Sequence, residues 1–152
     1  MTISKPMKYQ KVIALTTSLV SAALIAGCGG DKKAAAVGNS PQSLQGHTIS
    51  VAVTGGAAPF SSTGSYVFTP TSGNGNSGTY QLQGSGGVQS NIGSYTYTKT
   101  GNNTASLVET EQSGTVVQNT LSFDALNSGT IHSTSSNANP PTGFENGNFT
   151  LN

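Results

Sequence analysis

Few side chains in this chain of 152 residues could perform acid–base chemistry. They are two histidines, His47 and His132, and five acids, four of which lie in the C-terminal half. No Gly-x-Ser-x-Gly sequence is present to expose a serine nucleophile on a sharp turn. A Ser–His–acid set drawn from the many serines has no motif behind it, so we predict solvated hydroxyls and no enzyme activity.

Glu109 and Glu111 are the most closely spaced acids. On a strand, two residues separated by one lie on the same face, with carboxylates about 7 Å apart. Such a pair occurs in glycosidases and in divalent-ion sites. We favour the simpler interpretation that they form a solubilising outer face or guard a strand end with negative charge.

A zinc site is the other metal alternative. It would combine His47 and His132 with acids from other strands, and no close spacing of His, Asp and Glu indicates one. We therefore interpret both histidines as surface or structural residues, and we predict no metal and no cofactor.

Aromatic side chains are the remaining candidates for a binding site. Tyr66, Tyr80, Tyr95, Tyr97 and Phe123 could line a pocket for a small apolar ligand or a sugar. However, the body holds only 25 larger apolar residues, so the same side chains are needed to make a core. We predict that most of them are core, with the pocket kept as the alternative.

The elements that must position these side chains are strands. Apolar residues repeat with period two, as in Ile49, Val51 and Val53, and clusters of Gly and Asn separate the repeats. No body segment has the 3.6-residue period of a helix. We predict eight strands, over residues 47–54, 65–70, 79–83, 93–99, 104–110, 115–123, 129–134 and 146–151.

Short connections favour antiparallel pairing of neighbours as a meander. Each strand offers one apolar face and no helix is available to cover it, so the sheet must close on itself or fold into two layers. We predict an all-β fold: a single antiparallel meander of about eight strands closing as a small up-and-down barrel. A β-sandwich is the alternative.

The strand cadence from Ser94 to Thr130 resembles that of small lipocalin-like (calycin-type) barrels, although the chain has no Trp for the lipocalin Gly-x-Trp motif. This resemblance implies a carrier with a ligand in the barrel interior.

The first 28 residues have the pattern of an export signal. Lys5, Lys8 and Lys11 precede an apolar run from Val12 to Ala26, which ends in small residues and a cysteine. The run of 15 residues is shorter than the ~20 that a bilayer-spanning helix needs. We predict a secretory signal, with a permanent membrane anchor or a buried helix as the alternative.

The end of this signal resembles the lipobox of bacterial lipoprotein precursors, with the sequence Leu24-Ile25-Ala26-Gly27-Cys28. The resemblance implies diacylglycerol on Cys28, cleavage before it and acylation of the new N-terminus, so the membrane is a partner through this anchor. Gly29 replaces the Asp that often retains such proteins at the inner membrane, which favours the outer membrane of a diderm bacterium. With Cys28 lipidated, no thiol remains for a disulfide or a redox site.

The predicted domains are a signal peptide over 1–27, the lipidated cysteine and a flexible tether over 28–43, and a β domain over 44–152. In the tether, Lys32 and Lys33 could touch anionic lipid, but we favour solvated charge.

Beyond the first eleven residues, the chain has three lysines and five acids, so acids outnumber basic residues there. A nucleic-acid partner is therefore not expected. We expect a non-enzymatic structural or interaction module for an envelope partner, a carrier of a small apolar ligand or sugar as the alternative, and a hydrolase last.

Overall fold

A computed structural model describes residues 38–136 and 143–152. The predicted signal peptide, Cys28 and most of the predicted tether lie outside these residues. Within them, no helix has the length and apolar character required to cross a membrane.

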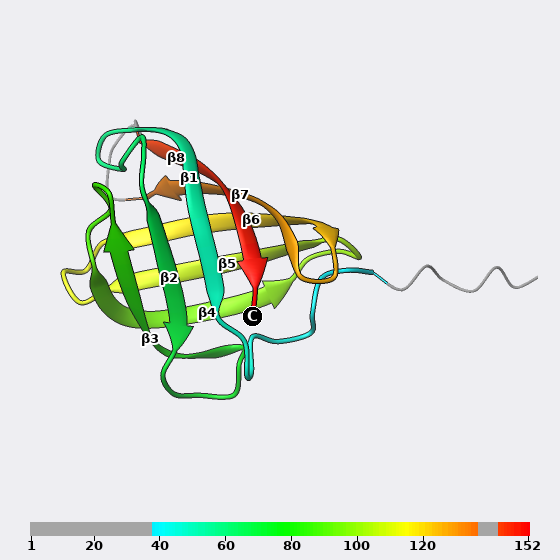
Figure 1. The fold of residues 1–152 in the computed structure, drawn as a ribbon. Helices are drawn as coiled ribbons and strands as arrows, with labels where there is room; N and C mark the ends of the chain where they lie inside the picture. The colour runs from blue at the N-terminus through cyan, green and yellow to red at the C-terminus, as the bar shows by residue number, and fades with distance from the viewer. Residues whose placement is uncertain (1–37, 137–142) are drawn as a thin grey trace, which may run out of the picture. The chain divides into compact units, whose positions relative to one another are not determined.

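All eight predicted strands occur, with ends within three residues of their expected positions. The strands pair antiparallel in sequence order, and β1 pairs with β8, so the sheet is a closed barrel (Figure 1). This confirms the predicted all-β meander and barrel and rules out the sandwich. The strands are β1 (Ile49–Ala57), β2 (Ser65–Pro70), β3 (Ser77–Ser85), β4 (Asn91–Lys99), β5 (Thr104–Glu111), β6 (Val116–Ala125), β7 (Ser128–Ser135) and β8 (Phe144–Leu151).

The closure joins residues that are about a hundred positions apart in the sequence. Ile49 and Val51 of β1 are Cα partners of Leu151 and Phe149 of β8. Because successive residues alternate between the two faces of a strand, these four apolar side chains enter the interior together. Every strand edge is paired, so none of the eight offers a free edge for aggregation.

An up-and-down meander places its loops alternately at the two ends of the barrel. We call one end the closed end: it carries the loops 71–76, 100–103 and 126–127, together with residues 38–48. The other end carries the loops 58–64, 86–90 and 112–115, and we call it the mouth.

The closed end is sealed by the segment that precedes β1. Leu44 is fully buried, and its amide donates to Gly75 O over 2.8 Å. Gly75 has a φ of 82° and its Cα approaches the Gln45 backbone so closely that a Cβ would clash. Apolar side chains from all eight strands fill the interior behind Leu44.

Residues 38–43, which we expected to be the end of a flexible tether, instead contact the barrel. Ser40 is buried and its hydroxyl donates to Gly101 O over 2.8 Å. Lys99 Nζ donates to Ser40 O over 2.7 Å, and the Tyr97 hydroxyl donates to Pro41 O over 3.0 Å. Their low large-apolar content suggested a tether, but hydrogen bonds of the Ser40 hydroxyl and of the Ser40 and Pro41 carbonyls hold the segment on the barrel.

Candidate functional site

The interior changes from apolar to polar along four adjacent strands. The period-two pattern that carries Leu and Phe inward near the closed end carries polar residues inward near the mouth. Asn119, Ser133 and Glu145 are Cα partners on β6, β7 and β8, so they form a continuous row across the sheet. Glu109 on β5 lies one inward position beyond Leu107, the partner of Asn119. All four polar residues are buried.

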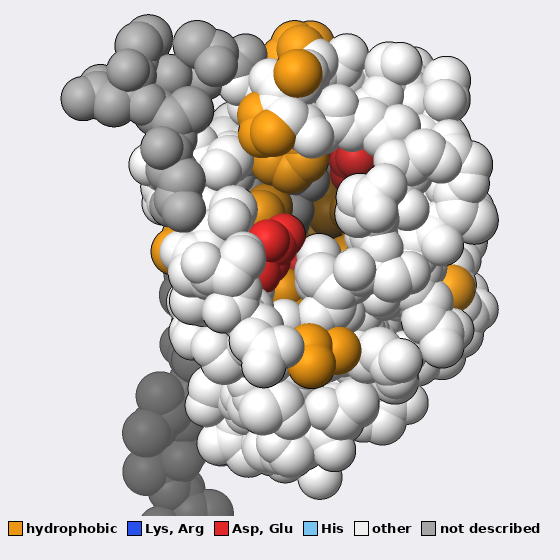
Figure 2. All heavy atoms as spheres, turned by 90° about the vertical axis from the view of Figure 1, so that its left-hand side faces the viewer, with side chains coloured by type: hydrophobic (Ala, Val, Ile, Leu, Met, Phe, Trp, Pro, Cys, Tyr) orange, Lys and Arg blue, Asp and Glu red, His pale blue; other side chains and the backbone are white. Residues whose placement is uncertain are grey.

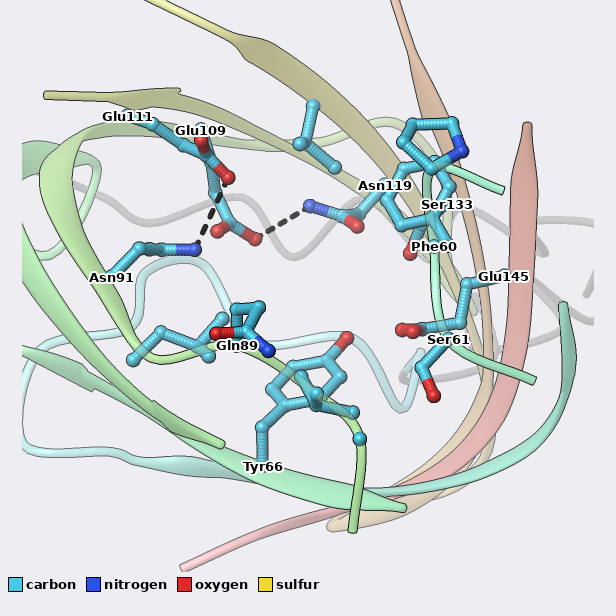
Figure 3. Close-up of a pocket in the computed structure, with 15 residues that line it drawn as sticks. Phe60, Ser61, Tyr66, Gln89, Asn91, Glu109, Glu111, Asn119, Ser133 and Glu145 are labelled. Atoms are coloured by element: carbon cyan, nitrogen blue, oxygen red, sulfur yellow. Dashed lines mark hydrogen bonds between the residues drawn. The ribbon is translucent and has the colours of Figure 1, made fainter. Parts of the chain in front are cut away.

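A cavity of about 140 Å³ opens at this end of the barrel. Figure 2 shows the hollow, with acidic and hydrophobic side chains gathered around it. The polar part of its wall includes Glu109, Glu111, Asn119, Ser133 and Glu145. The apolar part includes Phe60 and Val88 from the mouth loops, the ring of Tyr66 and Leu82 (Figure 3).

Glu109 is the most strongly perturbed acid of the site. Its carboxylate oxygen Oε1 accepts a hydrogen bond of 2.7 Å from Asn119 Nδ2, which also donates to Leu107 O over 3.0 Å. Burial raises the pKa of Glu109 to about 7, although Asn119 and the nearby Tyr80 hydroxyl act in the opposite direction. Near neutral pH this carboxyl is therefore close to half ionised.

Glu145 lies on the other side of the cavity from Glu109 (Figure 3). It is 4% exposed, and burial raises its pKa, an effect that the Tyr66 hydroxyl partly offsets. Burial, followed by the negative charge of the two glutamates, in turn raises the pKa of Tyr66 well above its ordinary value. Tyr66 therefore stays a neutral phenol beside the carboxylates.

Glu111 lies nearer the rim and is half-buried. Its two carboxylate oxygens accept hydrogen bonds from Asn91 Nδ2 at 3.2 Å and from Ser113 Oγ at 2.9 Å. The Asn91 amide is thereby oriented with its nitrogen toward β5, while its oxygen is buried without a partner.

Ser133 has one of four buried side-chain oxygens that find no hydrogen-bond partner among the described residues; the other three belong to Tyr80, Asn91 and Tyr95. Ser133 is 1% exposed and lines the cavity, and its hydroxyl has no hydrogen-bond partner. The oxygen lies close enough to the Tyr66 hydroxyl to influence its ionisation, but without hydrogen-bond geometry. A buried hydroxyl without a partner costs roughly 1–3 kcal/mol, so a molecule in the cavity could complete its bonding.

No cation offsets the acids of the mouth within the described residues. Lys99 is the only lysine or arginine in the ranges 38–136 and 143–152, and it bonds Ser40 at the closed end. His132 points to the outside, where its Nδ1 lies 2.7 Å from Asn146 Oδ1, and His47 lies before β1 near the closed end. In the same ranges, no group of three His, Cys, Asp or Glu residues is arranged to hold a metal ion.

The five aromatic residues singled out in the sequence are all buried, but the structure separates them. Tyr66 lines the cavity, whereas the other four pack elsewhere in the interior. The Tyr80 ring stacks on Phe68 with centroids 4.9 Å apart. The other packed aromatics are Tyr95 against Phe68, Phe123 against Phe149, and Tyr97 beneath Pro41.

The interpretation of Glu109 and Glu111 as an outer face is wrong. They share a strand face, as expected, but that face is the interior, and Glu109 is 4% exposed. Sequence reasoning also missed Asn119, Ser133 and Glu145 as site residues. The period-two pattern could have indicated them, because each lies an even number of residues from a buried apolar residue of its own strand.

Searches against family models, curated proteins and solved structures returned no match for this chain.

Proposed function

We propose that this protein is an exported, lipid-anchored barrel that binds a small polar molecule in its mouth without transforming it. The observation that carries the proposal is the buried, unpartnered Ser133 hydroxyl that faces a cavity beside two buried carboxylates. Buried polar groups lower stability unless they are hydrogen-bonded. A bound molecule at the mouth would supply the missing partners.

The size of the cavity limits the ligand. A volume of about 140 Å³ is comparable to cavities that take a molecule the size of benzene, and it exceeds what one water needs. Long acyl chains and oligosaccharides are too large for it. The lipocalin-like carrier, which was the alternative function in the sequence analysis, is thus the one we propose, restricted to small ligands. The polar wall favours a polar ligand over an apolar one.

The anchor is compatible with an open mouth. The proposed lipid on Cys28 precedes Gly38 in the chain, and Gly38 packs against Asn102 of the closed end. The first described residues, 38–48, lie at the end of the barrel opposite the mouth loops (Figure 1). A lipid on Cys28 would therefore be joined to the barrel through the closed end.

The two other functions explain less of the mouth. A module that only displays its outer surface has no use for buried carboxylates, which lower its stability. Hydrolysis is supported by Glu109, because a carboxyl with a pKa near 7 can serve as a general acid. However, neither histidine of the described residues lines the cavity to act as a base beside Glu109, so we favour binding.

A ligand screen tests the proposal. The full-length chain, purified in a nonionic detergent, is mixed with sugars, polyols, amino acids, amines and carboxylic acids of at most about ten heavy atoms. The readout is the NMR signal of the Ser133 backbone amide and of the Asn119 side-chain amide.

We expect at least one class to shift both signals, and Ser133→Leu to abolish the shift by filling the cavity. Thr130→Leu, which faces outward on the same strand, is the matched control and should leave binding intact. The proposal is refuted if no class shifts the mouth signals, or if Ser133→Leu binds as the wild type does.

A further inference from the structure

The hydrogen-bonding atoms left open at the mouth are mainly acceptors. Asn119 Nδ2 is committed to Glu109 and Leu107, and Asn91 Nδ2 is committed to Glu111. The atoms that remain toward the cavity and can only accept hydrogen bonds are the buried Asn91 Oδ1 and the carboxylate oxygens that the amides do not reach. The hydroxyls of Ser133 and Tyr66 and the exposed Gln89 amide also line the cavity and can both donate and accept. A ligand that serves the atoms that only accept donates hydrogen bonds.

The charge of the mouth has one sign. Glu109, Glu111 and Glu145 all line the cavity, and among the described residues no lysine or arginine lies near them. An anion would be repelled, whereas a cation would offset the cost of keeping ionised carboxylates out of water.

A bare metal ion does not fit this arrangement. Glu109 and Glu111 project from β5 and Glu145 projects from β8 across the hollow (Figure 3). No three acids or histidines of the described part of the chain converge on one point. The cation must therefore have a body that occupies the space between the walls.

The apolar wall indicates the nature of that body. Phe60, Leu82 and Val88 line the cavity together with the ring of Tyr66. Aliphatic and aromatic walls accommodate a short hydrocarbon part, and an aromatic face also attracts a cation.

Building on the proposed function, we propose that the mouth binds a small protonated amine, attracted by the combined negative charge of the three glutamates, with its short hydrocarbon body against Tyr66 and Phe60. An ammonium group has three donors and no acceptor, which matches the open acceptors. The dimensions of the cavity restrict the amine to roughly the size of benzene.

Binding should also depend on pH, because an ammonium is bound best by ionised carboxylates. Glu109 on β5 is faced by titratable side chains from β2, β3, β4 and β8, and Glu111 follows it on its own strand. These facing groups are Tyr66, Tyr80, Tyr95 and Glu145. The four facing groups and Glu111 carry no positive charge, so deprotonating Glu109 adds to the attraction for an ammonium.

Isothermal titration calorimetry of the full-length chain in nonionic detergent tests the inference with n-butylamine hydrochloride, n-butanol and sodium butyrate. At pH 8 we expect n-butylammonium to bind at least about tenfold more tightly than n-butanol, which has the same shape without the charge. Butyrate should not bind detectably. At pH 5.5, n-butylammonium should bind several-fold more weakly than at pH 8.

Variants locate the interaction. Glu145→Gln and Glu109→Gln should each weaken n-butylammonium binding about tenfold or more, whereas Asp124→Asn, an exposed acid on β6 with the same loss of charge, should not. Far-UV circular dichroism checks that each variant keeps its barrel. If Glu109→Gln fails to fold, Glu145→Gln decides.

The inference is overturned if n-butanol binds as tightly as n-butylammonium, or if the glutamate variants bind it like the wild type. If amines fail but another class in the ligand screen shifts the Ser133 signal, only the amine assignment is wrong. If no class shifts that signal, the proposed binding function fails as well.

Discussion

Replacing Glu109 by Gln should stabilise the barrel at alkaline pH. The substitution keeps the side-chain shape and an oxygen that can accept the 2.7 Å hydrogen bond from Asn119. It removes a charge that the folded protein must keep almost completely away from water, since Glu109 is 4% exposed. Stability should therefore rise where wild-type Glu109 is ionised.

The magnitude follows from proton linkage. Burial raises the pKa of Glu109 from 4.5 to about 7. Below pH 4.5 the carboxyl is protonated in both the folded and the unfolded chain, so it costs nothing. Between pH 4.5 and pH 7 the unfolded chain releases its proton while the folded protein retains it, and the free energy of unfolding falls. Above pH 7 the loss is complete at about 3 kcal/mol.

Urea unfolding of the full-length chain in nonionic detergent, followed by circular dichroism at pH 5 and pH 8, measures this loss. We expect wild type to be less stable at pH 8 than at pH 5, and Glu109→Gln to remove about 2.5 kcal/mol of that difference, because part of the loss has already occurred at pH 5. Some pH dependence should remain, because the pKa of Glu145 is also raised. Asp124→Asn removes an exposed charge and is the control.

Two results would refute this reasoning. One is a Glu109→Gln variant whose stability varies with pH as steeply as that of wild type. The other is a variant that is less stable than wild type at pH 8, which would mean that the ionised carboxylate contributes to the fold.

Three further predictions concern the closed end, the sheet and the anchor. Leu44→Ala should lower the free energy of unfolding by about 2–5 kcal/mol in urea titrations, because this fully buried side chain seals the interior and its loss leaves a cavity. Gly129→Ala should have a much lower melting temperature than the control variant Gly55→Ala. A Cβ at Gly129 would clash with the backbone oxygen of Ser122, whereas one at Gly55 meets nothing within 4 Å. Equal melting temperatures would show that the backbone at Gly129 shifts to accept the methyl group. Cys28→Ala should release the protein from the membrane fraction or block its processing. Mass spectrometry of the wild-type membrane fraction should find an acylated Cys28 at the mature N-terminus. An unmodified cysteine there would disprove the lipid anchor.

The fold was predictable because its determinants are local. Side chains such as Ile49, Val51 and Val53 alternate within one strand, and Gly- and Asn-rich turns follow directly, so neither feature depends on distant residues. Closure then follows from the need to cover one apolar face without helices. The register between strands, such as the pairing of Val51 with Phe149, is not determined by local patterns and comes from the structure.

The mouth was not predictable in the same way. Asn119, Ser133 and Glu145 become neighbours only through the registers of β6, β7 and β8. Each is a polar residue of a type that is usually exposed on a strand, and the same is true of Glu109. The apolar residues two positions away, Leu107, Leu121 and Ile131, turn Glu109, Asn119 and Ser133 inward. Glu145 has glycines at both such positions, so only its register with Ser133 places it inside.

A carbon-13 NMR titration of the glutamate side-chain carboxyls in the full-length chain, with and without n-butylamine, is the most direct test of the account. We predict that Glu109 titrates with a pKa of about 7 in the free protein and with a lower pKa when the amine is bound, because the ammonium favours the ionised carboxyl. A Glu109 pKa near 4.5 in the free protein, unmoved by the amine, would contradict both the burial of Glu109 in the mouth and the ligand assigned to it.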